Sequence, residues 1–188
     1  WWYGASAPIL MAVNVMPITG IVRWVMAQAL DDLLDSLEDA DDATREEAAK
    51  ALAELANPAT LDALIGACGD EFWSVRTRAG WGVAKIGGPK AIEALIVLFN
   101  DPIMEVRNEA VAAVVSLGAG QLDRLLAAMK DERWRVREHA AKACGDLHDS
   151  GAVDALIFAC RDRDGAVKSA AAEALGKIGD PKAIPALV

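Results

Sequence analysis

Few side chains in this sequence could carry out chemistry, and they are widely spaced. His139 and His148 are the candidates for metal binding or proton transfer, and Cys68, Cys144 and Cys160 are the candidate nucleophiles. Zinc sites and disulfide frameworks use closely paired cysteines, but the count is odd and no CxxC motif occurs. No base accompanies the cysteines, which fall at apolar positions of helical patterns. We therefore predict no catalytic residue, no metal and no cofactor, and a reducing, cytoplasmic location.

Phosphate chemistry is also not indicated. The glycine-rich stretch "RAGWGVAKIGG", residues 78–88, lies in and after a predicted helix and does not connect a strand to a helix, as a phosphate-binding loop would. The chain of 188 residues carries a formal net charge of −9 and has a pI near 4.7. An acidic surface disfavours binding to a phosphate backbone. We expect no nucleic-acid partner.

The elements that position these side chains follow from an internal repeat of about 31 residues. Its clearest mark is an aspartate followed six residues later by a basic residue, usually after a valine. The pairs are Asp39 with Arg45, Asp70 with Arg76, Asp101 with Arg107, Asp131 with Arg137, and Asp162 with Lys168. One interval is 30 residues long, and the missing residue falls in the turn "GAG". Five pairs at one period indicate a repeat protein.

Each repeat predicts two helices. After the basic residue, apolar positions recur at offsets of three, four and seven, which is the pattern of one helix face. Turns follow with the sequences "NP", "GGP", "GAG", "HDS" and "GDP", and a second apolar stripe follows each turn. A single helical hairpin cannot bury its apolar faces, so we expect the hairpins to stack.

The stretches "AIEALIVLFNDPIMEVRNEAVAAVVSLG" and "DRDGAVKSAAAEALGKIGDPKAIPALV" resemble the short HEAT-like repeats first named from phycobilin lyases. The resemblance implies an all-α α-solenoid, a right-handed superhelix of antiparallel helical hairpins, with about five hairpins in residues 29–188. It also implies that the Asp and Arg side chains tie each turn to the next helix. The residues to which this structural role is assigned are Asp70, Arg76, Asp101, Arg107, Asp131 and Arg137.

The resemblance suggests one enzyme alternative, a bilin lyase or isomerase-like subunit. Because it lies in scaffold positions, and scaffold does not imply function, we rank this second. HEAT-like deoxyhypusine hydroxylases hold two irons through repeated His-Glu pairs, whereas this chain has a single "EH" pair, at Glu138 and His139. The leading prediction is a non-catalytic scaffold that binds a protein or peptide on the concave face of the solenoid.

The predicted binding face is the outward side of the Val-Arg helices. Trp81 is the leading residue, because its position holds lysine, alanine or glutamate in other repeats. Gly80 is expected to clear space beside it, while Gly82 falls where helices approach closely. Trp73, Met104 and Trp134 share a position at the start of these helices and are predicted to join the face, with the alternative that Trp73 and Trp134 only cover the ends of neighbouring helices. The remaining predicted partner-binding residues are Thr77, Arg78, Glu109, Glu138, His139 and Lys142.

Residues 1–28 form an apolar arm in this interpretation, and the first 22 carry no charge. The run is long enough to span a bilayer, but Pro8, Pro17 and Asn14 make it a poor spanning helix. We expect the arm to pack on the first hairpin or to be foreign or processed sequence, with a membrane-tethered scaffold as the alternative. Uncapped terminal repeats leave oligomerisation open.

Overall fold

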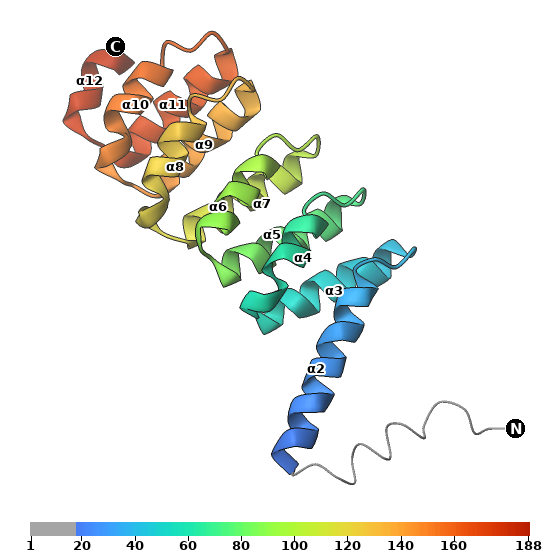
Figure 1. Ribbon diagram of the computed structural model, residues 1–188. Helices are drawn as coiled ribbons and strands as arrows, with labels where there is room; N and C mark the ends of the chain where they lie inside the picture. The colour runs from blue at the N-terminus through green and yellow to red at the C-terminus, as the bar shows by residue number, and fades with distance from the viewer. Residues whose placement is uncertain (1–17) are drawn as a thin grey trace, which may run out of the picture.

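The chain folds into a stack of helical hairpins (Figure 1). The structure is a computed structural model and describes residues 18–188. Within these residues the regular elements are α-helices and four single-turn 3-10 helices. The α-helices are α2 (Ile18–Ser36), α3 (Asp42–Leu55), α4 (Leu61–Ala67), α5 (Trp73–Ile86), α6 (Pro89–Leu98), α7 (Met104–Ser116), α8 (Leu122–Ala128), α9 (Trp134–Asp146), α10 (Val153–Ala159), α11 (Gly165–Ile178) and α12 (Ile184–Leu187). The predicted all-α solenoid architecture is confirmed.

Two layers of helices run through the stack. The long-helix layer consists of α3, α5, α7, α9 and α11, each of 13 or 14 residues. The short-helix layer consists of α4, α6, α8 and α10, each of 7 to 10 residues. Each short helix packs on the long helix that follows it, and successive long helices pack side by side.

Local sequence signals define the ends of the helices. Asp41 caps α3 by accepting a hydrogen bond from the backbone N–H of Thr44, and Asp164 caps α11 in the same way through Ala166. Gly179 ends α11 with φ 72°, a left-handed conformation that glycine adopts without steric cost. Pro89 opens α6 at a position whose N–H has no helical partner. The turns are therefore encoded locally.

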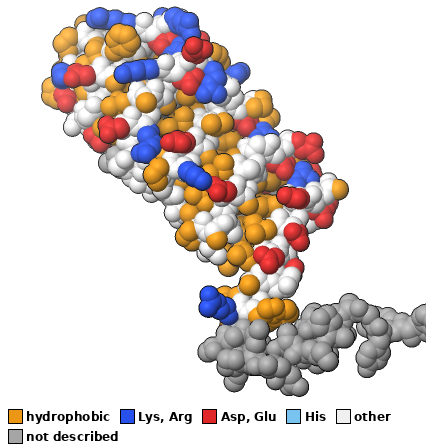
Figure 2. Space-filling view, viewed as in Figure 1, with side chains coloured by type: hydrophobic (Ala, Val, Ile, Leu, Met, Phe, Trp, Pro, Cys, Tyr) orange, Lys and Arg blue, Asp and Glu red, His pale blue; other side chains and the backbone are white. Residues whose placement is uncertain are grey.

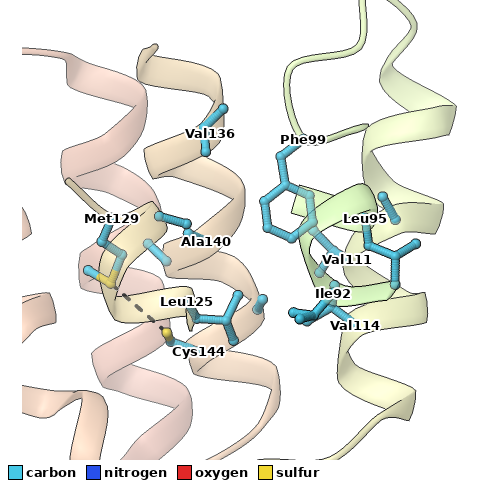
Figure 3. Packing of buried hydrophobic residues seen from close by; sticks show 14 of the residues in the cluster. Ile92, Leu95, Phe99, Val111, Val114, Leu125, Met129, Val136, Ala140 and Cys144 are labelled. Atoms are coloured by element: carbon cyan, nitrogen blue, oxygen red, sulfur yellow. Dashed lines mark hydrogen bonds between the residues drawn. The ribbon is translucent and has the colours of Figure 1, made fainter. Parts of the chain in front are cut away.

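The core lies between the two layers and is continuous along the stack. Fully buried Leu64, Leu95, Leu125 and Leu156 recur at one position of successive short helices. Figure 3 shows the middle of this core, where Phe99, the residue after α6, points toward α9. The Phe99 ring is fully buried, and it contacts His139 of α9.

Small residues let the long helices approach backbone to backbone. A Cβ placed on Gly82 of α5 would lie 3.0 Å from the Cβ of Ala53 in α3, and one on Gly145 of α9 would lie 2.7 Å from the Cα of Ala174 in α11. The predicted packing reason for Gly82 agrees with this geometry. At the position of α7 equivalent to Gly145 the chain carries the larger Val115. Of the successive long helices, α7 and α9 approach one another least closely.

The stack begins with α2, which extends beyond the first long helix (Figure 1). Leu30, Leu33, Leu34 and Leu37 at its carboxyl-terminal end pack against the core. The helix runs through residue 28, where we placed the boundary of the amino-terminal arm. Residues 1–17 of that arm lie outside the described residues. Within residues 18–188, none of the helices is long and apolar enough to span a bilayer.

Candidate functional site

A ladder of ion pairs runs along the turns that precede the long helices. Arg76 donates from Nη1 to the carbonyl oxygens of Asp70 (2.8 Å) and Glu71 (3.0 Å) of its own turn. Its Nε and Nη2 donate to the carboxylate of Asp101 in the next repeat, at 2.7 and 2.8 Å. The pair is almost fully buried. One guanidinium thus closes its own turn and binds the next, which is a geometry that arginine provides and lysine does not.

We call each pair between the arginine of one repeat and the repeat aspartate of the next a rung; the two residues are 25 apart, or 24 across the 30-residue interval. Arg45 forms such a rung with Asp70, with contacts of 2.7 and 3.1 Å. Arg137 forms another with Asp162, with two contacts of 2.8 Å. The hydrogen bonds from Arg137 hold the pKa of Asp162 below its ordinary value. Asp70 and Asp101, two of the aspartates predicted to be structural, therefore bind the arginine of the preceding repeat, as does Asp162.

The rung between Arg107 and Asp131 is open. Arg107 still donates to the carbonyl oxygens of Asp101 (2.7 Å) and Pro102 (3.0 Å), but its buried Nε has no hydrogen-bond partner. The carboxylate of Asp131 is instead bound by Arg133, two residues away, through two contacts of 2.9 Å. The open rung coincides with the loosest junction between long helices, that of α7 with α9.

The predicted row of apolar residues at the start of the long helices is exposed. The exposed fractions are 45% for Trp73, 56% for Met104 and 38% for Trp134. The Arg135 guanidinium lies 4.8 Å from the centroid of the Trp134 ring. A groove of about 550 Å³ lies beside Trp73, between the turn before α5 and the turn before α7. Apolar side chains repeated at one exposed position are typical of a contact surface.

Trp81 is half-buried and held in place. Its Nε1 donates to Oε2 of Glu109 in the next repeat at 2.9 Å, and the ring packs against the core. Gly80 does not clear space beside this ring on the binding face, because a Cβ there would lie 3.2 Å from Cδ1 of Leu98 in α6. That expectation was wrong, since the position faces the short-helix layer. The Trp81 ring is thus fixed in position and partly exposed on the face of the long helices.

The predicted place of His139 was also wrong. We placed it on the binding surface, but its side chain is 1% exposed and contacts Phe99, with ring centroids 6.1 Å apart. The junction between the third and fourth repeats brings α6 against α9 as well, and this contact buries the ring. Its Nδ1 lies 2.8 Å from the carbonyl oxygen of Arg135, and burial lowers the pKa of the imidazole. His139 cannot contact a partner in this structure.

Arg78, Glu138 and Lys142 of the predicted face form ion pairs within the chain. Arg78 bonds to Glu46 at 3.3 Å, and Lys142 bonds to Glu138 at 2.7 Å. Thr77 lies on the same side of α5, and its hydroxyl donates to the carbonyl oxygen of Trp73 at 3.1 Å. This internal pairing leaves the apolar groups as the unpartnered part of the face.

A shallow groove of about 470 Å³ crosses this face between α7, α9 and α11. Val111, Ala112 and Val115 of α7 supply its apolar side, and Lys142 and Lys177 are among the charged residues at its rim. Lys177 bonds to Asp146 at 2.8 Å and to Glu173 at 2.9 Å. The groove therefore combines an apolar wall with a rim of neutralised charges.

The potential metal ligands and thiols of the described residues are dispersed or buried. Among residues 18–188, no three His, Cys, Asp or Glu side chains gather as a metal site would require. Burial raises the pKa of the Cys68 and Cys144 thiols to about 12 and also raises that of Cys160. A thiol with a raised pKa is a poor nucleophile at neutral pH.

Two features escaped the sequence analysis. Phe158 is 81% exposed on α10, at a position held by glycine, valine or alanine in other repeats. The sequence signal was a large aromatic residue at a position where the other repeats carry a smaller side chain. The groove beside Phe158, between α8 and α10, could not be seen from the sequence because it is formed by two separate helices.

The stacked hairpins, continuous core and ion-pair ladder define an α-solenoid. The family model for HEAT repeats matches residues 18–118 and 122–188. The chain belongs to the HEAT-repeat family, as its sequence resemblance predicted. No curated protein is significantly similar to it over its sequence.

Solved structures share the fold at low sequence identity. One describes microtubule plus-end tracking by XMAP215, CLIP-170 and EB1, with 18% identity, TM-score 0.65, and coverage of 83% of this chain and 82% of that chain. A TOG domain of crescerin, from an array that regulates microtubules in the primary cilium, has 18% identity, TM-score 0.64, and coverage of 84% and 80%. The complex of CpcE and CpcF of phycocyanin lyase from Nostoc sp. PCC7120 has 24% identity, TM-score 0.51, and coverage of 81% and 66%. These similarities concern the fold.

Proposed function

We propose that this protein is a non-catalytic scaffold that binds a protein or peptide on the face of the long-helix layer. A HEAT-like solenoid is a typical interaction scaffold, and its extended layer of parallel helices offers a long contact surface. The binding face in this proposal is the concave one. The contact row is formed by Trp73, Met104 and Trp134, and the half-buried Trp81 forms a rigid wall beside it.

One observation carries the proposal. Three successive repeats place a large apolar side chain at the same exposed position, although exposure of such groups to water is unfavourable. Trp and Met are enriched at the centres of protein interfaces, where they supply much of the binding energy. The neighbouring charged side chains are paired within the chain. A partner can therefore contact the apolar groups without desolvating unpaired charges.

The test is a binding measurement on a triple variant. A partner is first captured with the wild-type chain, and its affinity is then measured for Trp73→Ala/Met104→Ala/Trp134→Ala. We expect affinity to fall by at least about tenfold, since interface tryptophans commonly contribute more than 1 kcal/mol each. Trp81→Ala is measured separately, and a smaller loss is expected because the ring is partly buried.

Ile184→Ala provides the control. Ile184 is 59% exposed on α12 and does not line the groove beside Trp73, so its truncation removes apolar surface without touching the proposed face. Equal affinity of the wild type and the triple variant would overturn the proposal. We propose no lyase activity, because the likeness to the phycocyanin lyase complex concerns the fold. Bound bilin in the purified protein would contradict this choice.

A further inference from the structure

A second groove lies on the opposite layer of helices, between α8 and α10. Its volume is about 790 Å³, which is in the range of pockets that hold ligands. Leu126 and Met129 line one side, and Ala155 and Ala159 line the other. Phe158 stands at its edge with 81% of the side chain exposed. The groove therefore offers an apolar floor and one projecting aromatic ring.

The cations around this groove are not neutralised. Lys130 and Arg161 are exposed and form no ion pair with any residue in the described part of the chain. Arg163 donates to a backbone carbonyl oxygen, that of Glu132, at 3.1 Å. These three side chains leave an excess of positive charge, because the Glu132 carboxylate is the single unpaired acid among the groove's lining residues within 18–188.

The groove's other carboxylates are already bound by cations. Asp154 accepts a hydrogen bond from Lys182 at 2.8 Å, and Asp162 accepts from Arg137 at 2.8 Å. Asp131 is bound by Arg133 at 2.9 Å. These acids contribute little attraction to Lys130, Arg161 and Arg163, so the cations remain available to an external anion.

This local excess of positive charge contrasts with the rest of the chain. Residues 1–118 contain 17 acidic and 8 basic residues, whereas residues 119–188 contain 11 of each. The whole net charge of −9 therefore falls in the first part of the sequence. Figure 2 shows acidic side chains gathered toward the α2–α3 end, and acidic and basic side chains intermixed at the end formed by α10 to α12. An acidic ligand is repelled at one end of the solenoid and tolerated at the other.

We propose that the groove between α8 and α10 is a docking site for an acidic peptide segment that carries a large apolar side chain. The apolar side chain enters between Met129 and Phe158, and flanking carboxylates bind Lys130 and Arg161. Charge complementarity selects an acidic peptide over a basic one, and the apolar floor selects it over a purely acidic one. The site is separate from the long-helix layer and does not depend on the function proposed for that layer.

The experiment measures fluorescence polarisation with labelled peptides. The probe is a short peptide of glutamate, leucine and phenylalanine. One comparison peptide has lysine in place of every glutamate, and the other has serine in place of every apolar residue. We expect the probe to bind at least about tenfold more tightly than either comparison peptide, with an affinity that falls as salt is raised. No binding, or equal binding of the three peptides, would overturn the proposal.

Two variants locate the site. Phe158→Ala and the pair Lys130→Glu/Arg161→Glu each change exposed side chains, so the fold is retained, which circular dichroism checks. We expect each to weaken probe binding by about tenfold or more, while Val97→Ala, a change at the equivalent exposed position of α6, leaves it unchanged. Unchanged binding by both groove variants would overturn the assignment. Salt-sensitive self-association lost in these variants would identify a second copy as the occupant and overturn the choice of a separate peptide.

Discussion

Arg133 binds the carboxylate of Asp131 through two hydrogen bonds of 2.9 Å, and Arg107 is thereby left without the aspartate that the repeat assigns to it. In the repeats on either side, the residue two positions after the aspartate is Ile103 or Asp164, neither of which can compete for the carboxylate. A single arginine therefore accounts for the open rung. The open rung lies beside the 30-residue repeat and beside Val115. The junction of α7 with α9 differs from the other junctions in these features.

Asp101 and Asp131 occupy the same position of their repeats, so their variants isolate the contribution of a rung. Both accept a hydrogen bond from the backbone of the turn that follows, at 2.8 Å. Asp101→Ala also leaves the buried guanidinium of Arg76 unpaired, and we expect a loss of about 3 kcal/mol in the free energy of unfolding. Asp131→Ala should cost about 1 kcal/mol. Urea denaturation measures both, and equal losses would show that the rung adds no stability.

Replacing Arg133 should not harm the fold, although it removes an ion pair. Arg133→Ala frees Asp131 to bind Arg107, whose Nε then gains a partner. We expect the free energy of unfolding to stay constant or to rise by up to about 1 kcal/mol. Denaturation gives the energy, and the NMR signal of the Arg107 Nε–H reports the new bond. In an Asp131→Ala background the gain should disappear, and a loss above about 1 kcal/mol in the single variant would contradict this account.

Two glycines in long helices should respond in opposite ways to replacement by alanine. At Gly145 a Cβ would lie 2.7 Å from the backbone of Ala174, so α9 and α11 would have to separate. We expect Gly145→Ala to lower the free energy of unfolding by about 1–3 kcal/mol. At Gly176 of α11 nothing lies within 4 Å, so Gly176→Ala should raise it by about 0.5–1 kcal/mol. Thermal unfolding compares them, and a shared sign would refute the close-packing explanation.

Acidification should weaken the junction that contains His139. Burial is the largest cause of its lowered pKa, with Lys142 and Arg107 acting in the same direction, while the Arg135 carbonyl and Glu138 act against them. The unfolded chain therefore binds this proton more readily than the native state, and stability falls as pH drops below about 6.5. The slope is at most about 1.4 kcal/mol per pH unit.

Urea midpoints at several pH values between 7.5 and 5 test this. His139→Leu should remove most of the pH dependence, whereas His148→Ala, at the exposed second histidine, should keep it. The window lies above the range where the ion-paired aspartates take up protons, because the pKa of Asp162 is lowered from 3.8. A flat profile in the wild type would show that His139 is not a buried neutral imidazole.

The cysteines should react in an order set by burial. The pKa of Cys68 and that of Cys144 are raised to about 12, and Cys160 is raised by burial as well but is the least enclosed of the three. At pH 8 we expect native protein to react slowly with a chromogenic disulfide reagent, beginning at Cys160. Mass spectrometry identifies the modified residue. Rapid labelling of Cys144 before unfolding would contradict its buried placement.

The sequence predicted the architecture because each repeat encodes its own helices. Capping residues such as Asp41 and Asp164 act within one turn, and the small residue at Gly82 marks a contact that recurs. Such signals are local or periodic, so they can be recognised without knowing how the repeats are oriented.

The site was less predictable, because its details depend on how one repeat lies on the next. The spacing of Asp70 and Arg76 suggests a pair within one turn, whereas the carboxylate bound by Arg76 belongs to the following repeat. His139 shares its sequence column with exposed Arg78 and Glu109, yet it is buried by Phe99, the residue after α6. Equivalent positions of successive repeats are equally exposed when all junctions between repeats are alike. The junction of α7 with α9 differs from the others, so the prediction failed for His139.

The open rung also has a mechanical consequence. Five long helices meet at four joints, and the joint between α7 and α9 combines the loosest approach with an unformed ion pair. When the two ends are pulled apart, the energy of a repeat array is released joint by joint, and the weakest yields first. We expect a force-extension curve in which residues from about 119 onward separate as one body from those before. Under tension the chain would behave as two stiff segments joined by one compliant link.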